Sequence, residues 1–544
     1  MSVRRVAWSS AGSSHDRITR LIVRRSNRKR ESSRLGARAC SLPHVFLMPE
    51  LSALIGGRRL ILVSNREPYE HVRSGGVTEI RRPPGGLVSA LDPLMRRTNG
   101  TWVAWGSGNA DRDVADRDGH VPVPPEDPSY VLRRVWLDES EIEGYYQGFA
   151  NSALWPLCHM FAQHFEPRSD DWEKYRIVNE RFAHAVAEEA AGSVDPVIWV
   201  QDYHLALVSA TVRELVPGAL IHQFWHIPFP PPDIFQLMPS GMGIALLRGM
   251  LGNDLLEFQT DRAARNFLAC VDELIPDARI DSERQQVQND GRTTTVRAFP
   301  ISIDVKYYEG LAEEPSAAKL AATLRDRYTK KGRQLAVSVD RVDYTKGIIE
   351  RLRALDLMWA RHRELRECLV FIIVATPSRS ALAVYKQLEE QVAEQVEQIN
   401  AKYRTKGWTP IVLIAENVSA DRLAAIYRAA DLCIVSSLQD GMNLVAKEFI
   451  ACQVDERGLL LLSRFAGAAE EIEGATLINP FNIDGLADGL KGALAVPLEE
   501  RRARMARMRY DLHGATIFDW LRSILTAANE LRPQRPAGIR SMKV

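Results

Sequence analysis

One short segment of the chain carries the residue types from which a sugar or nucleotide site is built. A carboxylate (Asp440), a glycine (Gly441) and an amide (Asn443) follow an apolar run, and a second carboxylate, Glu448, comes eight residues after the first. Gly441 lets the backbone approach a ligand closely, and the helix expected next offers free N–H groups to negative charge. Asp440 can therefore bind sugar hydroxyls, and Glu448 can reach a ribose. The alternative for an isolated Asp-Gly pair is an ordinary strand-to-helix turn.

Two cations, Arg341 and Lys346, follow a predicted strand at 335–339. A fork-shaped guanidinium and a compact ammonium five residues apart can bracket a diphosphate together. Cations in that position stabilise the negative charge that develops on a departing phosphate. The alternative is a pair of solvated surface cations, but the neighbouring Asp343 and Gly347 favour a loop at a ligand site.

In the first half of the chain, Asp202 and His226 each follow a predicted strand. A carboxylate and an imidazole at strand ends indicate acid–base catalysis or direct hydrogen bonds to sugar hydroxyls. The alternative for His226 is a core histidine whose ring is satisfied by a backbone carbonyl.

A third group of residues suits a phosphorylated acceptor. Arg66 ends the first predicted strand, Arg379 follows another, and Tyr146 and Trp155 lie nine residues apart in an aromatic segment. Two arginines and a phenol can hold a phosphate monoester, while an indole can pack on the apolar face of a sugar. For Trp155 alone, packing in an aromatic core is the alternative.

The elements that must position these residues alternate along the chain. Strands alternating with helices imply parallel sheets built from right-handed βαβ units. The apolar pattern lapses at 301–318, which predicts two doubly wound Rossmann-like domains facing each other across a cleft. The predicted strands are 60–63, 197–200, 220–225, 255–258, 335–339, 369–374, 411–414, 432–435, 459–462 and 477–479; helices include 205–215, 381–403 and 420–430. The predicted domains are 58–303, 304–496 and a pair of C-terminal helices at 497–531 that brace the first domain.

Composition agrees with a large enzyme. The 544 residues exceed what one core usually holds, and a net charge of +1 with 26% charged residues indicates neither a nucleic-acid nor a membrane surface. Six cysteines without a Cys-x-x-Cys pair favour reduced thiols and a cytoplasmic location. No apolar stretch approaches the roughly 20 residues of a membrane helix. The sequence is compatible with a homo-oligomer but does not specify one.

Residues 1–50 differ from the rest of the chain. They are rich in Arg and Ser and contain three acidic residues. This composition is typical of an organellar transit peptide, of a disordered basic tail, or of an extension ahead of a true start at Met48. We favour the last two, because the segment has little apolar periodicity, and we expect no catalytic residue there.

The motifs, taken together and in order, resemble those of the retaining glycosyltransferases of family 20, which make trehalose 6-phosphate. The resemblance covers roughly residue 58 to the end of the chain. It rests on the stretches 60–66, 85–87, 146–156, 200–205, 226–230, 340–347, 436–448 and 463–469.

The resemblance implies a GT-B fold and glucose transfer from UDP-glucose to glucose 6-phosphate, without a cofactor or a metal. It implies front-face substitution, in which the departing phosphate takes the acceptor proton, since these motifs contain no clear carboxylate nucleophile. The implied catalytic residues are Asp202, His226, Arg341 and Lys346. The implied donor residues are Gly85, Gly86, Arg341, Lys346, Asp440, Gly441, Met442, Asn443, Leu444, Val445 and Glu448, and the implied acceptor residues are Arg66, Tyr146, Trp155, Asp202 and Arg379.

Several alternatives remain at this stage. A sister activity that glucosylates glycerol 3-phosphate shares the stretches 66–69 and 101–105, but Arg379 above all follows the trehalose 6-phosphate pattern. Gln439 stands where an arginine commonly precedes the Asp-Gly pair, so GDP or ADP remains an alternative to UDP. A non-catalytic regulatory homologue would have lost site residues that this chain keeps. A nicotinamide oxidoreductase would need a Gly-x-Gly-x-x-Gly after the first strand, and a metal-dependent transferase an Asp-x-Asp pair; these motifs contain neither.

Overall fold

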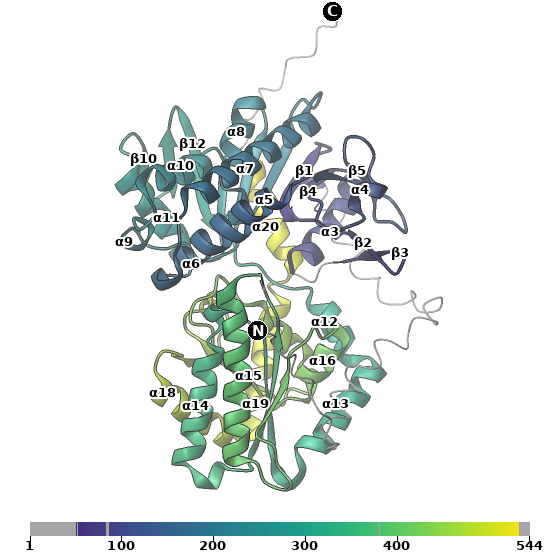
Figure 1. The fold of residues 1–544 in the computed structure, drawn as a ribbon, viewed down its shortest axis with the longest axis vertical. Coiled ribbons are helices and arrows are strands. Elements are labelled where there is room, and N and C mark those ends of the chain that lie inside the picture. Colours follow the sequence, from purple (N-terminus) through teal and green to yellow (C-terminus); the bar gives the residue numbers. More distant parts are fainter. Residues whose placement is uncertain (1–50, 52, 83–85, 380, 532–544) are drawn as a thin grey trace, which may run out of the picture.

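The computed structural model describes residue 51 and residues 53–82, 86–379 and 381–531. These residues form two units, each built around its own sheet (Figure 1). The predicted N-terminal extension, residues 1–50, lies outside the described residues.

The first sheet has ten strands in the order β10-β11-β12-β9-β8-β7-β1-β4-β6-β5, and its strands from β12 to β6 are parallel. Its strands are β1 (Leu60–Arg66), β4 (Thr101–Trp105), β5 (His120–Val123), β6 (Tyr130–Val135), β7 (Val197–Gln201), β8 (Leu220–Trp225), β9 (Leu255–Phe258), β10 (Arg279–Asp281), β11 (Gln286–Asn289) and β12 (Arg292–Ala298). A separate two-stranded ribbon contains β2 (Glu70–Ser74) and β3 (Val77–Arg81).

The second sheet has six parallel strands in the order β15-β14-β13-β16-β17-β18. They are β13 (Gln334–Arg341), β14 (Leu369–Thr376), β15 (Ile411–Ile414), β16 (Leu432–Val435), β17 (Leu459–Ser463) and β18 (Thr476–Ile478). Numbered within the sheet this is the Rossmann order 3-2-1-4-5-6. Its strand order reverses between β13 and β16, and that of the first sheet reverses between β1 and β7. Ligands of open α/β sheets bind outside the carboxyl ends of the strands at such switch points.

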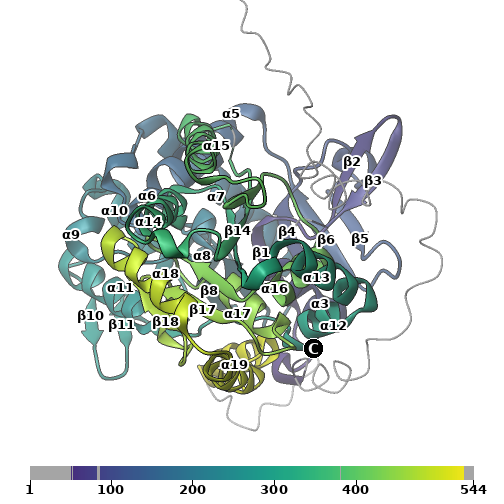
Figure 2. The same cartoon turned by 90° about the horizontal axis from the view of Figure 1, so that it is seen from below.

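Helices cover both faces of each sheet. In the second unit α14, α15 and α18 contact one another on one face, and α12, α13, α16, α17 and α19 pack together on the other (Figure 2). The helices of the first unit are α3 (Gly86–Thr98), α4 (Asp111–Val114), α5 (Glu139–Glu141), the π-helix η2 (Ile142–Leu154), α6 (Trp155–Cys158), α7 (Ser169–Ala190), α8 (Val208–Leu215), α9 (Pro232–Phe235), α10 (Ser240–Met250) and α11 (Asp261–Leu274). Those of the second are α12 (Val305–Glu313), α13 (Pro315–Tyr328), α14 (Ile348–Arg361), α15 (Ala383–Tyr403), α16 (Ala420–Ala429), α17 (Leu444–Cys452), α18 (Ile483–Ala495) and α19 (Leu498–His513).

The last helix, α20 (Ile517–Glu530), returns to the first unit. It begins with a capping box between Thr516 and Asp519. Its Trp520 ring lies 5.7 Å from that of Trp199 and 5.2 Å from that of Phe224 in the first sheet. The prediction that both C-terminal helices brace the first unit needs a correction, because α19 packs instead on α17 and β17 of the second unit.

The alternating pattern predicted from the sequence corresponds to these elements. The predicted strands 220–225, 255–258, 411–414 and 432–435 have the observed bounds, and the others differ by one to three residues at an end. The predicted break at 301–318 contains α12 and the start of α13, both in the second unit. The two parallel sheets with helices on both faces have the predicted doubly wound architecture, while the domain boundaries stay a prediction.

Candidate active site

The loops after the carboxyl ends of β16 and β8 bring the two units into contact. The backbone of Gly441 packs on that of His226 so closely that a Cβ at Gly441 would lie 2.3 Å from the His226 carbonyl oxygen. Beside this contact is a cavity of about 210 Å³ lined by both units, with Met160 and Gln259 on one side and Gln439 on the other. The glycine of the Asp-Gly pair is thus required by the approach of the two units. Gln439, the local departure from the family pattern, lies in their interface.

In the second unit, a short ion pair holds the Asp440 carboxylate. Lys346 Nζ lies 2.6 Å from Asp440 Oδ2, and the hydroxyl of Ser437 and the amide of Asn443 donate to the same oxygen at 3.1 and 3.0 Å. Burial by itself would raise the pKa of Asp440, but the charge and hydrogen bond of Lys346, together with the Asn443 amide, hold the pKa below its ordinary value. Asp440 therefore stays ionised, with its direction fixed by three donors.

The helix that follows presents its amino end beside this carboxylate. Asn443 has a left-handed backbone (φ 81°), and its side chain accepts from the Ala446 N–H as the N-cap of α17. The first turn of a helix leaves its N–H groups without intrahelical partners, so those of Leu444 and Val445 are free to bind an anion. Met442 is buried and packs in the core beneath this turn.

Glu448, further along α17, is held by two phenols. Its carboxylate oxygens accept from the hydroxyls of Tyr308 at 3.0 Å and Tyr427 at 3.2 Å. Burial raises the pKa of Glu448, and these two hydroxyls only partly oppose the rise. Each carboxylate oxygen has a second lone pair with which it can accept from a ligand hydroxyl.

Two arginines from the second unit lie over the indole of Trp155 in the first. Arg341, at the end of β13, has its guanidinium carbon 5.7 Å from the ring centre, and that of Arg379 lies at 3.9 Å. Arg379 also donates to Asp343 at 2.9 Å, to the Tyr385 hydroxyl at 2.9 Å and to the Tyr203 hydroxyl at 3.4 Å. The indole therefore fixes Arg379 in place, and direct contact of Trp155 with a sugar stays a prediction.

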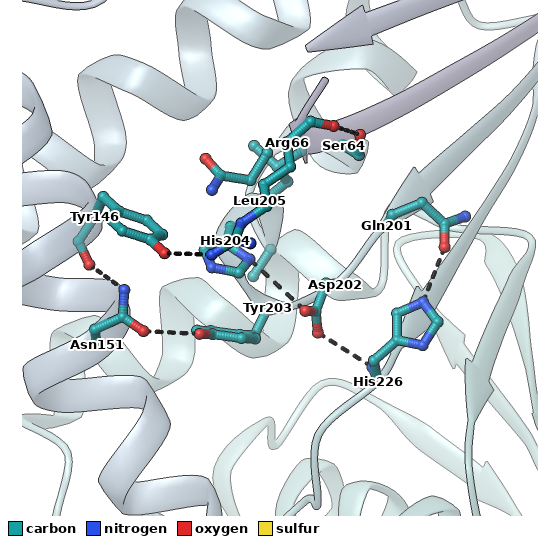
Figure 3. A network of polar contacts seen from close by, with 12 residues as sticks. Ser64, Arg66, Tyr146, Asn151, Gln201, Asp202, Tyr203, His204, Leu205 and His226 are labelled. Atoms are coloured by element: carbon teal, nitrogen blue, oxygen red, sulfur yellow. Dashed lines mark hydrogen bonds and ion pairs between the residues drawn. The ribbon is translucent and has the colours of Figure 1, made fainter. Parts of the chain in front are cut away.

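Arg66 and Tyr146 meet on the first-unit side of the site. Arg66 donates to the Tyr146 hydroxyl at 3.3 Å, and the Tyr146 ring stacks on His204 with 5.7 Å between ring centres (Figure 3). Burial by itself would raise the pKa of Tyr146, but the guanidinium groups of Arg66 and Arg379 lower it below its ordinary value. The two predicted phosphate-binding arginines, one from each unit, thus both bring positive charge near one phenol.

Asp202 lies at the centre of the network in Figure 3. It follows β7 with a left-handed backbone (φ 72°), and its Oδ1 accepts from the His226 N–H at 3.2 Å. Burial raises the pKa of Asp202 to about 6, although two backbone N–H groups and the charges of Arg379 and Arg341 oppose the rise. This carboxyl changes its charge close to neutral pH.

The His226 ring is held by two amides. Its Nε2 lies 3.0 Å from Gln201 Oε1 and its Nδ1 lies 3.3 Å from Gln259 Nε2. Burial lowers the pKa of His226 to about 3. The imidazole is therefore neutral near pH 7, which favours a hydrogen-bonding role over proton transfer by an imidazolium.

The predicted site residues and those that the structure brings together differ at a few positions. Gly85 lies outside the described residues, and Gly86 is the first residue of α3. Sequence reasoning passed over Asp343, Tyr203 and Tyr385, which hold Arg379. Asp343 and Tyr203 stand inside motifs that were already singled out, whereas Tyr385 lies in a helix with no signal of its own.

Among the described residues, no group of three or more His, Cys, Asp and Glu side chains could hold a metal ion. Within the same part of the chain, every helix is too short or too polar to cross a membrane. The described cysteines are free thiols, and all but Cys368 are buried.

Comparison with known proteins identifies the family. Residues 58–530 match the model of glycosyltransferase family 20. A trehalose-6-phosphate synthase of Mycobacterium avium (strain 104) is 38% identical over 490 residues, which cover 89% of this chain and 98% of that protein.

Solved structures agree with this match. An α,α-trehalose-phosphate synthase (UDP-forming) from Burkholderia xenovorans, in complex with glucose-6-phosphate, is 32% identical with a TM-score of 0.76, covering 86% of this chain and 99% of its own. A structure from E. coli, bound with UDP-2-fluoro glucose, is 29% identical with a TM-score of 0.77, covering 88% of this chain and 100% of its own. These likenesses confirm the predicted family and the two-domain fold class.

Proposed function

The chain belongs to glycosyltransferase family 20, and we propose that it transfers glucose, with retention, from UDP-glucose to glucose 6-phosphate. The products are α,α-trehalose 6-phosphate and UDP. The observation that carries the proposal is a pair of arginines at the junction of the units. Arg66 donates to Tyr146 within the first unit, and Arg379 of the second unit contacts Trp155 and Tyr203 of the first, close to the Lys346–Asp440 pair. The relatives named above, one with glucose 6-phosphate and one with a UDP-glucose analogue, support it.

The donor is assigned to the second unit. Arg341 and Lys346 neutralise the diphosphate, with the free N–H groups of Leu444 and Val445. Asp440 accepts hydrogen bonds from the glucose, and Glu448 accepts from the ribose. From the first unit the neutral His226 ring contacts the transferred glucose, while the donor role of the glycine pair at 85–86 stays a prediction from the sequence.

The acceptor is assigned to the junction of the units. Arg66, Tyr146 and Arg379 hold the 6-phosphate through charge-assisted hydrogen bonds, which are the stronger class of hydrogen bond. Trp155 supports the clamp from beneath Arg379. Asp202 accepts a hydrogen bond from the acceptor sugar between the two rings, and this bond is strongest with the ionised carboxylate.

Transfer follows a front-face path. The C1–O bond to the diphosphate breaks, the acceptor oxygen bonds to C1 on the same face, and the proton of the acceptor hydroxyl passes to the departing phosphate oxygen. Arg341 and Lys346 act mainly in the transition state, because the charge on the leaving diphosphate is greatest there. No protein carboxylate forms a bond to the sugar.

A product assay tests the proposal directly. UDP-, GDP- and ADP-glucose are each paired with glucose 6-phosphate and with glycerol 3-phosphate, and the products are identified by NMR. We expect trehalose 6-phosphate with the α configuration retained, and UDP-glucose as the preferred donor. Glucosylglycerol phosphate as the main product would replace the proposal with the sister activity, and no product from any pair would favour a non-catalytic homologue.

We also propose that the enzyme works in the cytoplasm, without nucleic-acid or membrane partners. The free thiols and the nearly balanced net charge of +1 support this location. Assembly into a homo-oligomer remains a prediction, tested by light scattering of the purified protein.

A further inference from the structure

A groove at the far end of the second unit has an unusual charge. It lies between the end of α13, the start of β13 and the loop from α15 to β15, and it has a volume of about 520 Å³. Its charged lining residues are Arg327, Arg333, Arg404 and Lys406, with no carboxylate among the lining residues. The whole chain has 70 basic and 69 acidic residues, so four lining cations beside one carboxylate, that of Glu367 on Arg333, depart from its average.

One of these cations is built into the protein. The Arg333 side chain is 7% exposed. Its guanidinium donates to the Glu367 carbonyl at 3.0 Å, to the Gly407 carbonyl at 2.7 Å and to the Glu367 carboxylate at 3.0 Å. These bonds use three of its five N–H groups, which leaves two for a ligand. The Glu367 carboxylate is engaged on its other oxygen by Thr405 at 2.9 Å.

The loop that carries two further cations is fixed. Thr405 and Trp408 exchange two backbone hydrogen bonds, at 3.0 and 3.3 Å, and the buried Trp408 indole donates to the Leu369 carbonyl at 2.7 Å. Lys406 and Gly407 therefore stand at the tip of a closed turn. Arg404 has a carboxylate of Glu397 only at 4.0 Å, beyond hydrogen-bonding distance.

This groove is separate from the active site. Arg333 immediately precedes β13, whereas Arg341 ends it, and eight residues of strand at about 3.3 Å each separate the two ends by roughly 25 Å. Gly441, after the carboxyl end of β16, contacts the first unit, whereas the groove lies beside the amino end of β13, at the opposite edge of the same parallel sheet. The volume lies within the roughly 300–1,000 Å³ typical of small-molecule sites.

We propose that this groove binds a phosphorylated small molecule, with the buried Arg333 as one contact and the exposed Arg404 and Lys406 as the others. Guanidinium groups match the oxygen geometry of phosphate, and a lysine adds a point charge. Both sugar phosphates and nucleotides carry this chemistry. The site is additional to the substrate site and does not depend on the identity of the acceptor.

Inorganic pyrophosphate is a suitable probe, measured by equilibrium dialysis on the full chain. The wild type should bind one more pyrophosphate than Arg404→Ala/Lys406→Ala, or bind the second one at least tenfold more tightly. The catalytic cleft contributes the same site to both proteins. Displacement of the additional pyrophosphate by glucose 6-phosphate would assign the groove to sugar phosphates, and displacement by UDP would assign it to nucleotides.

A matched variant, Arg353→Ala/Lys386→Ala, removes the same charge from exposed positions on α14 and α15. It should bind pyrophosphate like the wild type. Equal binding by the wild type and the groove variant, or equal losses in both double variants, would overturn the proposal. The groove variant should make trehalose 6-phosphate at the wild-type rate without pyrophosphate, which shows that it is folded and keeps this test separate from that of the proposed function.

Discussion

The site aspartates of the two units differ in the groups that bind them and in the direction of their pKa shifts. In the second unit two carboxylates of the site have a cation against them, Asp440 with Lys346 at 2.6 Å and Asp343 with Arg379 at 2.9 Å. In the first unit the Asp202 carboxylate accepts from a backbone N–H, and its pKa rises to about 6. The second unit thus offers fixed charges, suited to a diphosphate, while the first offers a carboxyl that titrates close to neutral pH.

The largest expected effect on kcat comes from removing one of the fixed charges of the second unit. Arg341→Ala should lower kcat by roughly 10²- to 10³-fold, the scale for one lost transition-state donor. Its guanidinium lies on an exposed strand end, so the fold should survive. Steady-state kinetics and circular dichroism of the variant check this, and a folded variant with near wild-type kcat would remove Arg341 from the leaving-group site.

A substitution at the contact between the two units should lower activity nearly as much. Gly441→Ala places a Cβ 2.3 Å from the His226 carbonyl oxygen, so the units must move apart. A misplacement of about 1 Å can cost about 10²-fold in rate, and we expect a loss of that order in kcat/KM.

The same substitution in α18 is the control for that prediction. A Cβ at Gly492 would meet nothing within 4 Å, so Gly492→Ala should keep full activity. If Gly441→Ala is as active as Gly492→Ala, then the close approach of the two units is not needed for turnover.

Asp202, the carboxyl of the first unit that titrates near neutral pH, predicts a pH dependence of kcat/KM. A carboxyl with a pKa of about 6 is ionised above that pH and protonated below it. Because the acceptor hydroxyl bonds the ionised form of Asp202 more strongly than the protonated form, kcat/KM should fall below pH 6, by at most about tenfold per pH unit. Asp440 and His226 should not add an inflection there, since the pKa of Asp440 is lowered and that of His226 is about 3.

Rate profiles between pH 5 and 8 for the wild type and Asp202→Asn check this prediction. The variant should be slow throughout and lack the inflection. An inflection near pH 6 that persists in Asp202→Asn would assign it to another group.

The smallest expected effect is that of a chelator. The leaving group is assigned to Arg341, Lys346 and helix N–H groups, so excess EDTA should leave kcat within about twofold of its untreated value. Complete loss of activity, restored by magnesium or manganese, would contradict the assignment of the charge to side chains. Slight stimulation by divalent ions would agree with it, because these ions also bind free nucleotide sugars.

The second unit was easier to predict from the sequence than the first. Its strands β13 to β17 are buried on both faces and read as continuous apolar runs, such as 369–374 and 459–462, which is the pattern of parallel strands. In the first unit β6 escaped notice because Arg134 lies within it. Arg134 is fully buried, where it pairs with Glu67 and Asp111 at 2.8 Å each, and a sequence pattern does not show such pairing.

The residues of the candidate site could also be predicted only in part from the sequence. Asp440, Lys346 and Asp202 could be found because each lies in the loop that follows a strand, and the topology of the sheets then brings these loops together. Tyr385 could not, because it holds Arg379 from within a helix whose periodicity indicates packing alone. Nor did the sequence indicate that the ring of Trp155 would lie beneath a guanidinium from the other unit.

The central claim is that the acceptor phosphate is held between the two units while the donor is held by the second. Steady-state kinetics of Arg379→Ala, with each substrate varied at saturation of the other, test it most directly. A charge-assisted contact contributes about 1.5–3 kcal/mol, so KM for glucose 6-phosphate should rise roughly ten- to a hundredfold. KM for UDP-glucose should stay nearly unchanged. A rise confined to KM for UDP-glucose, or an equal rise for both substrates, would contradict the account.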